Sequence, residues 1–126
     1  MRLHSWLVGC LVLACVSTVG SMMPAAADEI VIGGQCDRTG PTKPVGIQLC
    51  PGVFDYIKLV NKQGGVKGHT LRYIEVENGY KVDRGVEAYE RLKRDGAVTL
   101  LDYGTPIVYA LTPRHMEDKI PGLTPG

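Results

Sequence analysis

Small residues that can form hydrogen bonds follow two of the apolar segments that this sequence predicts as strands. Gln35, Asp37 and Thr39 come soon after the apolar run at residues 30–32, and Gly104 and Thr105 follow the run at 97–101. Ligands of open α/β sheets bind beyond the carboxyl ends of the strands. If the two strands are neighbours in the sheet, these residues lie together, and groups of this kind hold a small polar ligand without changing it chemically.

The usual catalytic signatures do not occur. The sequence has no GxSxG elbow, no P-loop and no HExxH motif, and the glycine pair at 33–34 does not form a GxGxxG turn. A general base needs a partner within reach. His115 and Asp118 could form such a pair, but we expect His115 to be a surface residue of a helix. Asp37 and Arg38 are either a charged pair in the binding loop or turn residues. We predict no enzyme, no catalytic residue and no cofactor.

The first 27 residues are typical of a secretory signal. A short basic start precedes an uncharged apolar run over residues 6–19, and small residues at 25–27 provide a cleavage site. We predict an exported protein that is cleaved after Ala27. One alternative is a single membrane anchor, for which the apolar run is short. The other is a lipoprotein, because Cys10 and Cys15 each end a segment that resembles a lipid-attachment box.

Two further cysteines, Cys36 and Cys50, would meet an oxidising compartment after export. A disulfide between them is one interpretation. Two free, partly buried thiols are the other and our expectation, because Cys36 would lie in a loop and Cys50 in a helix, and disulfide geometry is strict. No CxxC pair and no Cys/His spacing indicates zinc, so we predict no metal site.

The charge of the chain is nearly balanced. Fourteen Lys and Arg residues stand against 13 Asp and Glu residues, which gives a formal net charge of +1 over the 126 residues. This balance provides no electrostatic basis for a nucleic-acid partner, and we predict none.

Strand-like and helix-like apolar patterns alternate along the chain. We predict strands over residues 29–34, 69–77, 97–101 and 120–123, and helices over residues 45–63, 82–95 and 106–118. Such alternation is typical of a parallel sheet with helices on both faces, so the expected fold is α/β with a Rossmann-like sheet. Pro51 interrupts the first helix, which either bends near Ile47 or becomes regular only near Cys50.

Several motifs together resemble one known family. The most specific is NKQGGVKG at residues 61–68. It is joined by IVIG at 30–33, TGP at 39–41, two glycines in the first helix (Gly46 and Gly52), acidic Glu75 and Glu77, and Pro121 before Leu-Thr-Pro. These features resemble the periplasmic solute-binding proteins of ABC transporters for branched-chain amino acids and amides, which have the type I periplasmic-binding fold.

The resemblance implies a two-lobed protein whose hinge closes on a solute. Residues 28–126 would be the N-terminal part of lobe one, and we expect the chain to be a fragment. The implied partners are the small solute and an ABC permease in the inner membrane. Loops after the first, third and fourth strands would contact the solute, which adds Tyr103 and Thr124 to the predicted site. The implied site residues are therefore Gln35, Asp37, Thr39, Tyr103, Gly104, Thr105 and Thr124.

One loop departs from the family pattern. Asp102 and Tyr103 stand where many members have a run of small residues. These two residues make an ordinary amino-acid carboxylate a weaker match, so an amide, a urea-like compound or another solute is also a candidate. We expect weak or no binding by this chain alone, because good sites enclose most of the ligand. The alternative functions are a ligand-sensing domain of the same fold and a small secreted α/β enzyme that uses His115 or Asp37.

Overall fold

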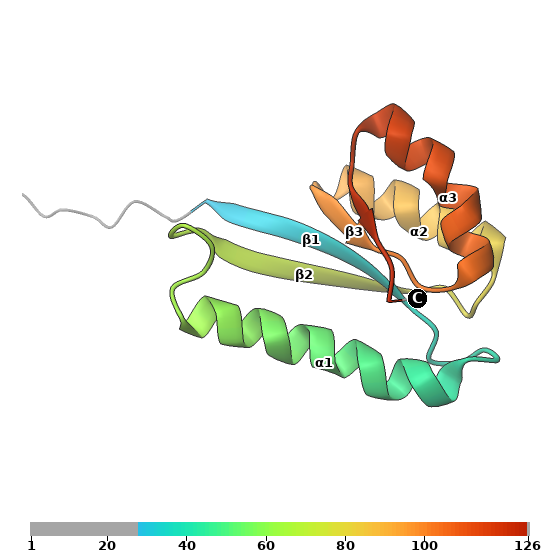
Figure 1. Cartoon of the computed structure of the whole chain (residues 1–126), viewed down its shortest axis with the longest axis horizontal. Coiled ribbons are helices and arrows are strands. Elements are labelled where there is room, and N and C mark those ends of the chain that lie inside the picture. The colour runs from blue at the N-terminus through green and yellow to red at the C-terminus, as the bar shows by residue number, and fades with distance from the viewer. Residues whose placement is uncertain (1–27, 126) are drawn as a thin grey trace, which may run out of the picture.

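The computed structural model describes residues 28–125, in which strands and helices alternate (Figure 1). The predicted signal segment and its cleavage site lie outside the described residues. The elements are β1 (Glu29–Cys36), α1 (Lys43–Lys62), β2 (Thr70–Glu77), α2 (Val82–Arg94), β3 (Thr99–Leu101), α3 (Thr105–Asp118) and β4 (Gly122–Leu123). None of the helices within this range is both long enough and apolar enough to span a membrane.

The strands form a four-stranded parallel sheet in the order β2-β1-β3-β4. Helix α1 covers one face, and α2 and α3 cover the other (Figure 1). Both the α/β fold and the covered faces were predicted, and both are confirmed. Because β3 lies beside β1, the polar residues that follow these two strands are brought to the same edge of the sheet.

The main core lies between the sheet and the pair α2 and α3. Its largest members, including Tyr89, Leu92 and Leu100, are fully buried. The core consists of Val31, Tyr89, Leu92, Ala97, Leu100, Ile107 and Leu111. This packing fixes where α3 begins, because Ile107 lies one turn from the loop that follows β3.

Strand β1 is longer than predicted. It continues through Gln35 and Cys36, which pair with Val76 and Glu77 of β2. The loop therefore begins at Asp37. Gln35 belongs to β1, which pairs with β2 on one side and with β3 on the other. The polar character of Gln35 favoured a loop, but the ladder partners supplied by β2 extend the strand.

Helix α1 runs without interruption from Lys43 to Lys62, with Pro51 in its interior. The prediction that the helix becomes regular only near Cys50 is wrong. Pro44 lies in the first turn, where a backbone N–H would have no acceptor within the helix, so proline costs no helix hydrogen bond there. The helix thus starts at the edge of the sheet where β1 ends.

A disulfide joins Cys36 at the end of β1 to Cys50 of α1, with 6.3 Å between their Cα atoms. The expectation of two free thiols is wrong. It assumed that Cys36 lies in a loop, whereas Cys36 is in β1. Gly46 of α1 is buried against the backbone of Asp37, and this close approach brings the helix next to the strand.

Candidate functional site

A cleft of about 230 Å³ lies at the edge of the sheet where β1 and β3 end. Its walls come from the start of α1, the turn before α2, the loop after β3, the start of α3 and the residue Pro125 beyond β4. The lining residues are Thr42, Val45, Leu49, Tyr80, Tyr103, Gly104, Thr105 and Pro125. None of these residues has a charged side chain, so the lining combines apolar and aromatic surface with hydroxyl and backbone groups.

The loop after β3 supplies three predicted site residues to this cleft. The Tyr103 hydroxyl donates a hydrogen bond to the Thr42 carbonyl at 3.4 Å, and its ring meets the Tyr80 ring edge-on with 6.5 Å between centroids. Gly104 has φ 110°, and a Cβ there would lie 3.1 Å from the Tyr80 ring. Thr105 begins α3, so its N–H is in the first turn, where helix N–H groups have no partner within the helix.

A buried polar network holds this loop from the interior. The Asn78 side chain donates to the Tyr103 carbonyl at 2.9 Å and to Gln35 Oε1 at 3.1 Å. Gln35 Nε2 in turn donates to Asp102 Oδ1 at 3.3 Å. Gln35 is only 3% exposed and does not line the cleft. Its position is that of a residue that supports the loop from below.

His115 anchors the other end of this network. Its Nε2 lies 2.6 Å from Asp102 Oδ2, and its Nδ1 lies 2.8 Å from the Ile120 carbonyl oxygen. The His115 side chain is only 12% exposed, so the expectation of a surface residue is wrong. Burial raises the pKa of the Asp102 carboxyl, against the opposing effects of His115 and Gln35.

Asp118, the other half of the predicted acid–base pair, does not contact His115 through any hydrogen bond described for residues 28–125. It accepts hydrogen bonds from Lys93 Nζ at 2.7 Å and from the Tyr89 hydroxyl at 2.8 Å. These two donors, Lys93 first, lower the pKa of Asp118. The hydrogen bonds from Lys93 and Tyr89 to Asp118 therefore tie α3 to α2, and Asp118 does not line the cleft.

Asp37 organises the turn between β1 and α1. Its carboxylate accepts hydrogen bonds from the backbone N–H groups of Thr39, Gly40 and Thr42 and from the Thr42 hydroxyl. Burial would raise the pKa of Asp37, but these hydrogen bonds outweigh it and lower the pKa below 3.8. Of the two interpretations of Asp37 and Arg38, turn formation is confirmed, because Arg38 pairs with Glu75 instead.

The remaining predicted residues lie apart from the cleft. Thr39 is exposed, and its hydroxyl donates to Glu77 at 2.9 Å. Thr124 lines a second cleft, of about 400 Å³, between α3 and β4. The structure thus brings together Tyr103, Gly104 and Thr105 in the cleft, whereas Thr39 and Thr124 do not line it.

The site residues missed from sequence include Tyr80 in the cleft wall and Asn78 beneath it. Both belong to the Asn-Gly turn after β2, where Tyr80 has φ 60° and its N–H donates to Asn78 Oδ1 at 2.9 Å. The dipeptide indicated a tight turn but not what the turn contacts. Only the pairing of β2 with β1 brings the turn to the loop after β3.

The chain matches a known family over almost all of its described length. The sequence model of the family described as periplasmic binding protein matches residues 29–126. The chain belongs to this family. The family is one of solute-binding proteins rather than enzymes, and its members are periplasmic or extracellular.

Individual relatives agree with this assignment. The chain is 31% identical over 84 residues to a Leu/Ile/Val-binding protein homolog of Brucella melitensis. The aligned residues cover 67% of this chain and 23% of that protein. A fatty acid ABC transporter substrate-binding protein from Thermomonospora curvata has a TM-score of 0.73 and 27% identity, with 79% of this chain and 25% of that chain covered.

A more distant solved structure shows the same fold. The branched-chain amino acid transporter substrate binding protein of Streptococcus pneumoniae, in complex with isoleucine, has a TM-score of 0.72 at 15% identity, over 79% of this chain and 29% of that one. The 126-residue chain spans about a quarter of the length of each of these three relatives.

Proposed function

We propose that this chain contributes one wall of the solute site in the substrate-binding component of an ABC importer. The observation that carries the proposal is the cleft at the carboxyl ends of β1 and β3, where Tyr103, Gly104 and Thr105 face the start of α1. This is the position at which open α/β sheets bind ligands. The names of the relatives, several of them ABC transporter substrate-binding proteins, support the same role.

The cleft suits a small solute with one polar and one aliphatic end. A carboxylate or amide oxygen is accommodated by the N–H and hydroxyl of Thr105, because a helix N-terminus favours negative charge. Val45, Leu49 and the Tyr80 ring offer apolar surface to an aliphatic part. The solute class we propose is therefore a branched-chain amino acid, an amide or a similar compound.

The position of Asp102 bears on this choice. From sequence, Asp102 and Tyr103 weakened the match to an amino-acid carboxylate. The Asp102 side chain is only 3% exposed and engaged by His115 and Gln35, and Asp102 does not line the cleft. Repulsion between Asp102 and a solute carboxylate is thus reduced by distance and by these partners, which favours retaining the amino acid in the proposal.

The cellular setting is proposed from the same family membership. The protein is exported to the periplasm, its signal peptide is cleaved after Ala27, and lipid anchoring is the alternative. It delivers its solute to an ABC permease in the inner membrane. The names of the relatives support the transporter, and the pattern of residues 1–27 supports the export.

Binding by this chain alone should be weak. The cleft volume of about 230 Å³ is below the roughly 300–1,000 Å³ of typical ligand pockets. Calorimetry with leucine, isoleucine, valine, an aliphatic amide and a fatty acid tests both the class of solute and the strength of binding. Micromolar affinity would contradict the expected weakness, and an equal response to every compound would contradict the proposed class.

A pair of threonine variants on α3 tests the site itself. Thr105→Val removes the hydroxyl at the cleft, and a neutral hydrogen bond worth about 0.5–1.5 kcal/mol corresponds to roughly 2- to 13-fold weaker binding. Thr112→Val is the matched control, because the Thr112 hydroxyl is exposed and donates to the Val108 carbonyl of its own helix. Equal affinities of the two variants would place the solute elsewhere.

A further inference from the structure

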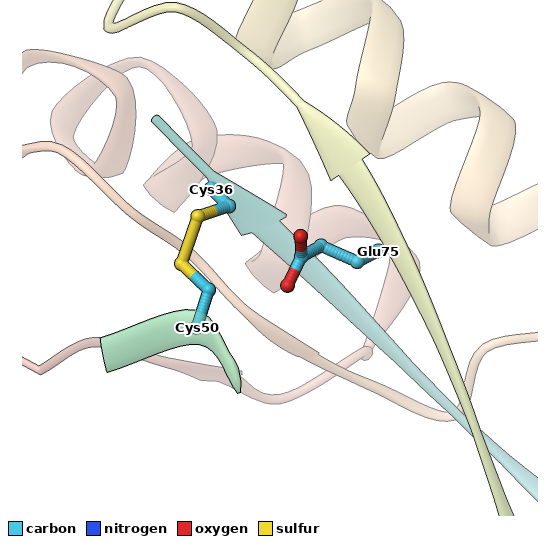
Figure 2. A group of neighbouring side chains, drawn as sticks. All are labelled: Cys36, Cys50 and Glu75. Carbon is cyan, nitrogen blue, oxygen red and sulfur yellow. A yellow bond between two sulfur atoms is a disulfide. The ribbon is translucent and has the colours of Figure 1, made fainter. Parts of the chain in front are cut away.

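Three metal-donor side chains meet on one side of the sheet, outside the cleft described above. Cys36 comes from the end of β1, Cys50 from α1 and Glu75 from β2, and their donor atoms all lie within 4.8 Å of one another. Figure 2 shows the Glu75 carboxylate turned toward the sulfur atoms of the disulfide. Two strands and one helix therefore position the three donors.

Glu75 has an oxygen that the surrounding protein leaves unused. Its Oε1 receives hydrogen bonds from Arg38 at 2.8 Å, while Oε2 is buried and has no hydrogen-bond partner among residues 28–125. The Glu75 side chain is 11% exposed. A buried acceptor without a partner is unfavourable and needs an explanation. A carboxylate oxygen of Glu75 lies within 4.8 Å of both sulfur atoms, so opening the disulfide would leave three metal donors side by side.

We propose that reduction of the Cys36–Cys50 disulfide creates a site for a thiophilic divalent cation of the zinc type, bound by both sulfurs and Glu75. Thiolates select zinc over magnesium or calcium, and zinc accepts carboxylate oxygen as a further donor. Two sulfurs on one tetrahedral zinc lie about 3.8 Å apart, so the two cysteine side chains must move apart once the S–S bond is broken. A fourth position remains for water.

The charges of this site balance when the cation is bound. Two thiolates and one carboxylate carry three negative charges, while the divalent cation and the Arg38 guanidinium carry three positive charges. A buried group of charges is tolerated when it is paired in this way. Arg38 also holds Glu75 Oε1, as outer partners of metal-ligating carboxylates commonly do, which leaves Oε2 available to the cation.

The redox step is a two-electron reduction. With a phosphine reductant, the S–S bond breaks, the phosphine becomes a phosphine oxide, and one water supplies the oxide oxygen and both thiol protons. Binding of the cation then releases those protons to solvent. In the oxidised protein the sulfurs are bonded to each other, so the site is closed.

Cobalt(II) tests the proposal, because its absorption reports thiolate coordination directly. The purified whole chain is reduced with a phosphine, exchanged into reductant-free anaerobic buffer and titrated with Co²⁺. We expect one equivalent to produce a sulfur-to-cobalt charge-transfer band, which zinc abolishes and which the oxidised protein does not show.

Two acidic variants on β2 make the test specific. Glu75→Gln should weaken binding at least about tenfold, the minimum loss seen even for outer partners of metal ligands. Glu77→Gln is the matched control, because Glu77 accepts hydrogen bonds from Arg38, Thr39 and Gly79 and is not one of the three donors. It should bind cobalt as the unaltered protein does.

Three results would overturn the proposal. The first is a reduced chain that keeps its circular dichroism spectrum but gives no charge-transfer band. The second is equal binding by the Glu75→Gln and Glu77→Gln variants, which would mean that only the thiols bind. The third is a reduced chain that unfolds and is not refolded by the cation, because the site requires the arrangement of β1, α1 and β2.

Discussion

Replacing Gly46 by alanine should destabilise the protein, whereas the same change at Gly52 should stabilise it. Both glycines are in α1, but Gly46 is buried and Gly52 is exposed. A Cβ at position 46 would overlap the Asp37 carbonyl oxygen and lie 2.8 Å from its carbon. A Cβ at position 52 would meet nothing within 4 Å.

The magnitudes follow from these surroundings. Alanine in place of glycine within a helix gains about 0.5–1 kcal/mol at either position. At position 46 an overpacking cost of about 1–3 kcal/mol opposes this gain. Because the clash is with backbone, which cannot rotate away, we expect the upper part of that range. The helix-propensity gain cancels in the difference between the two variants, which therefore measures the packing cost alone.

Urea unfolding followed by circular dichroism measures this difference. With a slope of about 1–3 kcal/mol per molar urea, a cost near 2 kcal/mol separates the two midpoints by roughly 1 M. If Gly46→Ala were as stable as Gly52→Ala, α1 would not approach the Asp37 turn as described. The wall of the cleft that begins at Thr42 would then be wrongly placed.

Two further predictions concern stability. The Cys36→Ser/Cys50→Ser double variant should be less stable by about 3 kcal/mol in urea unfolding, because the disulfide closes a loop with a sequence separation of 14; an unchanged midpoint would contradict this. Lys93 and Tyr89 lower the pKa of Asp118, so their contribution is present above pH 3.8 and is lost as pH falls through the lower folded value. Asp118→Asn should therefore reduce the loss of unfolding free energy at acidic pH. The same loss in the variant and the unaltered protein would contradict the pairing of Asp118 with Lys93 and Tyr89.

The fold was largely predictable because its signals are local. The β-branched run before Gly33, the glycines that end α1 and the charged face of α2 each mark one element, and alternation of the elements favours a parallel sheet. The position of β3 beside β1 then determines where the cleft lies. Gly104 and Thr105 were found in this way, and the family resemblance added Tyr103.

The errors have one physical source, which is contact between segments distant in sequence. Cys36 was assigned to a loop because pairing with β2 is not visible from its neighbours, and free thiols were preferred to the disulfide for the same reason. His115 carries no local sign that its partners are Asp102 and the Ile120 carbonyl. The partners of the buried Gln35 side chain, Asn78 and Asp102, likewise come from distant segments of the chain.

The most direct test of the proposed solute site is a chemical-shift map of the ¹⁵N-labelled chain titrated with leucine and with an aliphatic amide. This measurement detects weak binding and locates it. We expect chemical-shift changes centred on Tyr103, Gly104 and Thr105 and on the facing Thr42 and Tyr80. Changes confined to the second cleft, around Met116 and Lys119, or no change at millimolar solute, would contradict the proposed solute site.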